Sequence, residues 1–231
     1  MIKKLRYLKY YAKVLLNNWT ASKDSYAQHG EDKLVELLLP KGVHSFIDIG
    51  ANDGVLFSNT YKFAKSGARG LCIEPSRSSY NKLKLNHLFN RRVQSIQGAI
   101  SNKNGTILLE EDGYESTLSK VIKEKTQKSV EVPCYTMKEI LIKSPYFREV
   151  DLVSIDVEGH EFEVLDGMPN SDFYTKILII ESNKSQIGQL TKLSFLKDYT
   201  PFISNGINTF FKNNCYKPLN INTLPKDFNF C

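Results

Sequence analysis

The feature that most constrains the fold is an alternation, starting near His44, of short apolar runs with stretches of helical periodicity. Each run is about as long as a buried strand, and the stretches between them can cross from one strand to a parallel neighbour. The pattern predicts an α/β domain built on a parallel sheet with crossover helices. Its main predicted strands are residues 45–49, 70–74, 93–97, 151–155 and 176–180.

Other segments complete the pattern with less regular signals. Residues 98–135 predict a hairpin of short strands at 106–109 and 130–135 around a mobile loop. Near the end of the chain, strand-like pieces at 199–203 and 207–211 precede a closing loop or tail. The predicted helices that follow the polar entry at residues 25–32 are 34–39, 60–65, 78–89, 137–142, 161–165 and 187–196.

The net charge of +6 comes from the start of the chain. Residues 1–23 hold six basic residues and no acid, whereas the rest of the chain holds 25 of each sign. A neutral body argues against an extended nucleic-acid surface, which needs clustered Lys and Arg on the fold itself. Apolar residues at helical spacing predict that residues 1–24 form a basic amphipathic helix, separate from a domain at 25–231. That helix packs on the domain or contacts a membrane surface or a partner.

The four cysteines are far apart and form no C-x-x-C pair. Cys72 lies inside an apolar run, which predicts a small buried side chain rather than half of a disulfide. We therefore predict a cytoplasmic protein, with contact to the inner face of the membrane through the N-terminal helix as an alternative.

Polar residues gather where the first two predicted strands end. Asp48 lies near the end of the first strand, Asn52 and Asp53 follow it beyond a tight turn that Gly50 permits, and Glu74 ends the second. An acid at the second strand end can accept both hydroxyls of a ribose. Asn52 stands where a pyrophosphate loop needs glycine, and the nearby carboxylates favour a cationic ligand such as S-adenosylmethionine over NAD. The alternative is a strand-to-helix turn that binds nothing.

A second cluster follows the strand at 151–155, where Asp156, Glu158, His160 and Glu161 fall within six residues. Such a group cannot be buried without partners, so we expect it to face a cleft. His160 is the candidate general base, with Asp156 beside it, because histidine titrates near neutrality and can take a proton from a hydroxyl. In the alternative interpretation, His160 only makes local hydrogen bonds at the start of a helix.

Oxygen-bearing side chains also allow a metal site to be considered. Asp156, Glu181 and Asn183 would form an all-oxygen set suited to Mg²⁺. Hydrogen bonds to substrate or loop backbone, without a metal, account better for these residues. We therefore predict no metal.

Together, these stretches resemble the FkbM family of methyltransferases. The matching stretches, in the family's order, are residues 26–32, 46–54 with 58–60, 69–75, 98–102 with Gly105, and 155–161. The resemblance implies a class I, Rossmann-like methyltransferase fold with a mostly parallel seven-stranded sheet, helices on both faces and additional N-terminal helices. It also implies S-adenosylmethionine as the cofactor and O-methylation of sugars, glycans or polyketide hydroxyls.

The resemblance assigns roles to single residues. Asp48, Gly50 and Asn52, with Asp53, resemble the family's loop for the methionine end of the cofactor, and Glu74, with Pro75, resembles its ribose acceptor. By position, the adenine contacts are Ala99 and Ile100, and the active-site pair is Asp156 and His160.

The predicted function is methyl transfer to a hydroxyl of a sugar, a glycan precursor or a glycosylated product. Alternatives are a polyketide or other non-sugar acceptor, and a non-catalytic module that recruits partners through the N-terminal helix. An RNA methyltransferase is disfavoured because no basic run accompanies the predicted site. The oligomeric state stays open.

Overall fold

The computed structural model describes residues 24–111, 119–217 and 224–231. The N-terminal helix predicted for residues 1–24 therefore lies outside the described residues except for Asp24. The same holds for the centre of the predicted mobile loop, residues 112–118.

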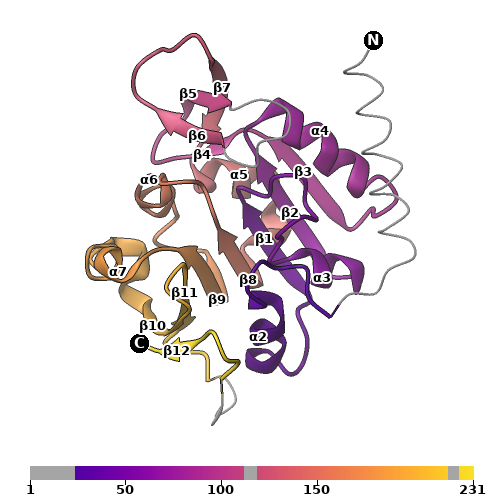
Figure 1. Cartoon of the computed structure of the whole chain (residues 1–231), viewed down its shortest axis with the longest axis vertical. Helices are drawn as coiled ribbons and strands as arrows, with labels where there is room; N and C mark the ends of the chain where they lie inside the picture. Colours follow the sequence, from indigo (N-terminus) through magenta and orange to yellow (C-terminus); the bar gives the residue numbers. More distant parts are fainter. Residues whose placement is uncertain (1–23, 112–118, 218–223) are drawn as a thin grey trace.

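A central sheet of eight strands organises the described chain (Figure 1). Five of them are mutually parallel and confirm the predicted β–α alternation. Beyond β9, two further strands and a short edge strand each pair antiparallel with their neighbours. In spatial order the strands are β12 (Asn229–Phe230), β10 (Tyr199–Ser204), β11 (Asn208–Asn213), β9 (Tyr174–Glu181), β8 (Glu149–Ile155), β1 (Ser45–Ile49), β2 (Arg69–Glu74) and β3 (Val93–Gln97).

The sheet thus differs from seven mostly parallel strands. The eighth strand, β12, comes from the segment predicted to be a closing loop or tail. Phe228, just before β12, is buried and packs edge-on against Phe210 at a ring-centroid distance of 5.8 Å. Burial of that aromatic side chain brings the C-terminal residues onto the edge of β10, because a large ring loses much of its contact with water there.

Helices cover both faces of the central sheet, as predicted. Alternate side chains of a strand point to opposite faces, so Phe46 and Ile47 belong to two different hydrophobic clusters. On the face of Phe46 the helices are α2 (Glu31–Leu38), α3 (Tyr61–Lys65) and α4 (Arg77–Asn86). On the face of Ile47 they are α5 (Met137–Lys143), α6 (Glu161–Asp166), α7 (Lys184–Leu190) and the short 3₁₀ helices Pro145–Phe147 and Ser194–Asp198.

The helix predicted over residues 187–196 is two shorter helices in the structure. The first, α7, starts earlier because Asn183 caps it and forms a capping box with Gln186. After α7 ends, Leu193 has an extended backbone with ψ 139°, so the helix cannot continue to Ser194.

A smaller sheet lies outside the central one and contains the predicted hairpin. It has four strands in the order β4 (Ala99–Ile100), β7 (Ser129–Tyr135), β5 (Gly105–Glu111) and β6 (Ser119–Ile122). β5 and β7 pair antiparallel, as predicted, and β6 adds a strand that the sequence pattern did not reveal. Figure 1 shows this sheet beside the ends of the central strands.

Glu31, in the first turn of α2, joins distant parts of the chain. Its side chain is fully buried, and one carboxylate oxygen accepts hydrogen bonds from the amides of Asn205 (2.9 Å) and Asn208 (2.8 Å). The neighbouring Asp32 accepts bonds from Ser25 and from the backbone N–H of Tyr26. The acids of the polar entry segment therefore hold α2 and its entry loop in place.

Cys72 is buried at 1% exposure, as predicted, and all four cysteines are free thiols. Among the helices of the described residues, none has both the length and the apolar character needed to cross a membrane.

Candidate active site

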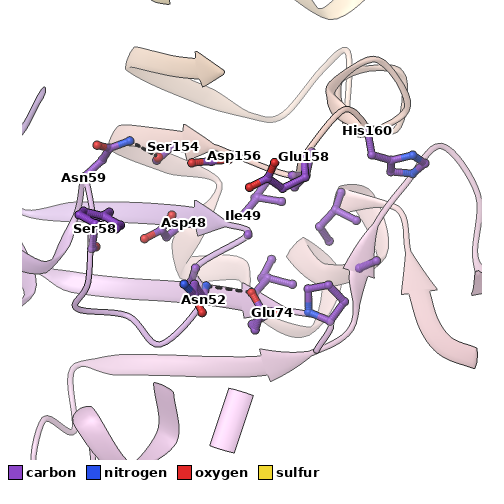
Figure 2. Close-up of a pocket in the computed structure, with 18 of the residues that line it drawn as sticks. Asp48, Ile49, Asn52, Ser58, Asn59, Glu74, Ser154, Asp156, Glu158 and His160 are labelled. Carbon is purple, nitrogen blue, oxygen red and sulfur yellow. Dashed lines mark hydrogen bonds between the residues drawn. The ribbon is translucent and has the colours of Figure 1, made fainter. Parts of the chain in front are cut away.

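A cavity of about 250 Å³ opens where β1, β2 and β8 end (Figure 2). The described residues around it include acids, amides, hydroxyls and apolar side chains but no Lys or Arg. Nine of the residues predicted to form the site converge here. They are Asp48, Gly50, Asn52, Glu74, Pro75, Ala99, Ile100, Asp156 and His160.

Gly50 fixes the loop after β1 between its two neighbouring strands. Its N–H donates to the Ile73 carbonyl (3.0 Å), and the N–H of Asp156 donates to the Ile49 carbonyl (3.0 Å). With φ +85°, Gly50 has a left-handed backbone, and a Cβ atom there would lie 1.7 Å from the Asp156 carbonyl oxygen. Only glycine fits this close approach.

Glu74 ends β2 at the cavity and is 5% exposed. One carboxylate oxygen accepts the N–H of Asn52 (2.8 Å) and the other accepts the N–H of Ser76 (2.8 Å). These bonds hold the Glu74 carboxylate beside the loop that follows β1, as Figure 2 shows.

Asp48, in β1, also lines the cavity and is buried. Its carboxylate accepts a hydrogen bond from the Thr60 hydroxyl (2.6 Å). Burial raises the pKa of Asp48 to about 7, the Thr60 bond opposes that rise, and the charge of Asp156 adds to it.

Four polar residues of the cavity wall were not assigned roles from the sequence: Gln28, Ser58, Asn59 and Ser154. The Asn59 amide donates to the Ser154 hydroxyl (3.1 Å), which links the loop before α3 to β8. The sequence signal was that Gln28 and residues 58–60 lie in stretches that resemble the FkbM family, without an indication of what they contact, and Ser154 had no signal.

Asp53 is the predicted site residue that the structure places outside the cavity lining. Its carboxylate instead accepts the N–H groups of Val55 (2.9 Å) and Leu56 (2.8 Å) and stabilises the turn after Asn52. The carboxylate is buried by that turn rather than directed at the cavity.

Asp156 and Glu181 form a hydrogen-bonded carboxyl pair at the ends of β8 and β9. Burial and the charge of Asp156 raise the pKa of Glu181 to about 8, and burial also raises the pKa of Asp156, so the pair holds a proton near neutral pH. Asp156 lines the main cavity, and Glu181 lines an adjoining recess together with Glu158 and Asn183. Glu158 borders both spaces and has a left-handed backbone with φ +54°, uncommon for a residue with a side chain.

The oxygen of Asn183 does not join the Asp156–Glu181 pair. It accepts the N–H groups of Ser185 (3.1 Å) and Gln186 (3.2 Å) at the start of α7. Within the described ranges, no three His, Cys, Asp or Glu side chains are arranged to hold a metal ion. Asn183 is thus a helix cap in this structure.

His160 lies at the start of α6 and at the margin of the cavity. Its Nε2 is 3.1 Å from the Ser101 hydroxyl, and its Nδ1 is 3.4 Å from the Glu163 carboxylate. Burial lowers the pKa of His160, although Glu163 opposes that shift, so the ring is neutral near pH 7. In Figure 2 the ring points away from Asp156 and Glu158.

The fold and the position of the cavity define the class. Strands β3, β2, β1, β8 and β9 follow the order of a doubly wound sheet, with the cavity at the carboxyl ends. This is the class I, Rossmann-like fold of methyltransferases. Residues 48–211 match the model of the methyltransferase FkbM domain, and the chain belongs to that family.

Several solved methyltransferase structures are similar to this chain at low identity. A precorrin-6y C5,15-methyltransferase from Geobacter metallireducens GS-15 is 13% identical over 83% of this chain and 92% of its own, with a TM-score of 0.47. An O-methyltransferase from Bacillus cereus in complex with SAH is 13% identical over 87% and 88%, with a TM-score of 0.42. A TehB-like SAM-dependent methyltransferase from Corynebacterium glutamicum is 12% identical over 89% and 97%, with a TM-score of 0.46. No curated protein matches the sequence.

Proposed function

We propose that this protein is an S-adenosylmethionine-dependent O-methyltransferase that acts on a hydroxyl of a sugar, a glycan precursor or a glycosylated product. The observation that carries the proposal is a single cavity that combines the Glu74 carboxylate, the glycine loop after β1 and several further carboxylates, without any Lys or Arg among its described lining residues. A pyrophosphate ligand would need cations or a glycine-rich loop of another pattern. A sulfonium nucleoside suits this lining better.

The residues present fit each part of that cofactor. Glu74, held by two backbone N–H groups, is placed to accept the ribose hydroxyls. Apolar Pro75, Ala99 and Ile100 offer a surface for the adenine ring, and the carboxylate side of the cavity suits the amino group. When bound, the cofactor supplies an electrophilic methyl group.

The chain must then position an acceptor hydroxyl and remove its proton. We assign removal of this proton to His160. The Glu163 carboxylate beside Nδ1 favours the tautomer with hydrogen on Nδ1, which leaves Nε2 free to accept the hydroxyl proton. The Ser101 hydroxyl lies within hydrogen-bond distance of Nε2, at 3.1 Å. Asp156 is the second candidate, because it lines the cavity and belongs to the carboxyl pair that holds a proton.

The cavity wall supports a neutral, hydroxyl-bearing acceptor. Ser58, Asn59 and Gln28 provide hydroxyl and amide groups for hydrogen bonds, whereas the carboxylates would repel a phosphate or an acidic sugar. A sugar hydroxyl meets these conditions. A polyketide hydroxyl is the alternative acceptor, and the acceptor assay must distinguish it from a sugar hydroxyl.

Cofactor binding is tested first, by titration calorimetry of S-adenosylhomocysteine into the full chain. Glu74→Gln should weaken binding by about 10- to 100-fold, since charge-assisted hydrogen bonds contribute roughly 1.5–3 kcal/mol. The matched control is Glu149→Gln, an exposed residue at the opposite end of the sheet, which should bind like wild type. Absence of binding by the folded wild-type protein would refute the proposal.

The acceptor is tested by transfer of a labelled methyl group to a cell extract separated into glycan, RNA and small-molecule fractions. Label in the glycan fraction supports the proposed acceptor. Label only in another fraction retains methyl transfer but refutes the sugar assignment. Tight cofactor binding without any transfer would indicate a binding module instead.

A further inference from the structure

Positive charge is segregated on the domain, although its total is balanced. Residues 54–109 contain nine Lys and Arg residues and a single acid, Glu74, which is buried at the cavity. This stretch spans α3, β2, α4 and β3, which together form one edge of the molecule (Figure 1). The neutral total therefore conceals a strongly basic edge.

Four of these cations are exposed around one corner of the edge: Lys65, Arg69, Arg91 and Arg92. Hydrogen bonds join the segments that carry them. The Arg92 guanidinium donates to the Gly67 carbonyl (2.8 Å), and the Asn90 amide donates to the Ala64 carbonyl (3.0 Å). The end of α3, the start of β2 and the turn after α4 thus form one surface at the amino ends of β2 and β3. The active-site cavity lies at the other ends of these strands.

Large apolar side chains are exposed among these cations. Leu88 is 60% exposed and Phe89 is 74% exposed, both in the turn after α4. Tyr146 is 75% exposed and lies under the Arg69 guanidinium, 5.6 Å from ring centroid to Cζ. We call Lys65, Arg69, Leu88, Phe89, Arg91 and Arg92 the basic corner. Its mixture of cations and protruding apolar side chains is typical of a surface that enters the headgroup region of a membrane.

The chain reaches the domain beside this corner. The Lys62 ammonium donates to the Asp24 carbonyl (2.8 Å), and the Lys65 ammonium donates to the Tyr26 hydroxyl (3.1 Å). Asp24 therefore lies next to α3, and the sequence that precedes it, residues 1–23, holds six more cations and no acid. On α2, the acid Glu36 is already paired with Lys62.

We propose that the basic corner docks on an anionic phospholipid surface. Its cations lie against lipid phosphates, while Leu88 and Phe89 enter the boundary between headgroups and acyl chains. Nucleic acid offers the same phosphates but no apolar layer for an exposed leucine. Docking through this corner leaves the cavity, at the opposite ends of the strands, open to water.

The test is sedimentation of the full chain with vesicles of phosphatidylcholine alone or with roughly 30% phosphatidylserine, at low and high salt. Wild type should bind only the anionic vesicles, and salt should weaken binding. Arg91→Glu removes one cation and adds one anion, so the partition coefficient should fall on the order of 25-fold, since each surface charge contributes about five-fold. Phe89→Ser should also weaken binding without changing the charge.

Matched controls carry the same chemical changes elsewhere on the surface. Lys192→Glu reverses an exposed charge near the other edge of the sheet, and Phe230→Ser removes a ring that is 61% exposed on β12. Both should bind vesicles like wild type. All four variants should retain the thermal stability and S-adenosylhomocysteine affinity of wild type, which separates this proposal from the proposed function.

Three results would overturn the proposal. The first is no binding to anionic vesicles by wild type. The second is an equal loss of vesicle binding in the corner variants and the controls, or a loss of vesicle binding in neither set. Either outcome would assign vesicle binding to the net charge or to residues 1–23 alone. The third is binding to a short RNA, but not to vesicles, that Arg91→Glu abolishes; this would make the corner a nucleic-acid surface.

Discussion

Gly50→Ala tests whether the site depends on backbone contact between the loop after β1 and the end of β8. Two effects add in this variant. Alanine must adopt φ +85°, which costs about 1–2 kcal/mol for a residue with a Cβ atom. The new Cβ atom would also lie 1.7 Å from the Asp156 carbonyl oxygen, about half of an ordinary contact distance.

Relieving that clash must separate the two loops. The two backbone hydrogen bonds nearest the clash, Gly50 to Ile73 and Asp156 to Ile49, are then weakened or lost. At about 1 kcal/mol each, they bring the total loss of unfolding free energy to roughly 4 kcal/mol. For a chain of this length, that lowers Tm by about 8–16 °C.

Gly42→Ala is the matched control. Gly42 has φ +83°, nearly the same as Gly50, but nothing lies within 4 Å of the position its Cβ atom would take. Thermal unfolding followed by circular dichroism should therefore show a fall of only about 2–8 °C, from backbone strain alone. If Gly50→Ala melts at the same temperature as Gly42→Ala, the contact with Asp156 does not constrain the loop and the reasoning fails.

Two further predictions concern ionisable groups. The pKa values of Asp48 and Glu181 are raised to about 7 and about 8, so between roughly pH 4 and 8 the folded state holds protons that the unfolded state has released. The free energy of unfolding should therefore fall as pH rises through this window. Glu181→Gln should make that fall shallower, whereas the exposed control Glu124→Gln should leave it unchanged. Urea titrations at several pH values would measure both variants, and a pH dependence in Glu181→Gln equal to that of wild type would contradict the raised pKa of Glu181. For catalysis, His160→Ala should lower kcat by at least about 100-fold with unaltered S-adenosylhomocysteine affinity, whereas His44→Ala, at the amino end of β1, should leave both intact. An active His160→Ala enzyme would transfer the role of base to Asp156.

Much of the fold could be predicted because buried parallel strands leave continuous apolar runs in the sequence. β1, β2, β8 and β9 lie within two residues of their predicted bounds. Elements whose existence depends on distant contacts left no such signal. β12 forms because Phe228 packs against Phe210, and β6 forms by pairing with β5.

In the site, too, some residues could be predicted from local sequence patterns and others depend on distant contacts. Asp48, Glu74 and Asp156 lie at or just after the carboxyl ends of apolar strands, so their convergence could be predicted from the rule that parallel strands end at one edge. Asn59 and Ser154 could not be found in that way, since their contact depends on how the loop before α3 folds back onto β8. Asp53 looked equivalent to Asp48, yet the turn after it uses its carboxylate for two N–H groups.

The total charge of the sequence did not predict how charge is distributed on the surface. The balance of 25 basic and 25 acidic residues after residue 23 argued against a phosphate-binding face, but a sum does not record position. Counting along the chain shows the basic stretch at 54–109, and only the fold shows that α3 and the turn after α4 bring Lys65, Arg91 and Arg92 to one corner.

The burial of Glu31 has a consequence for the order in which the chain can fold during synthesis. Its carboxylate, fully enclosed at the start of α2, is bonded to amides 174 and 177 positions later. A ribosome-bound chain that ends before Asn205 would have to enclose that charge without these amides, at a large cost in solvation. α2 can therefore dock in its final place only after the last antiparallel strands have been made, so the finished domain is assembled late and as one unit.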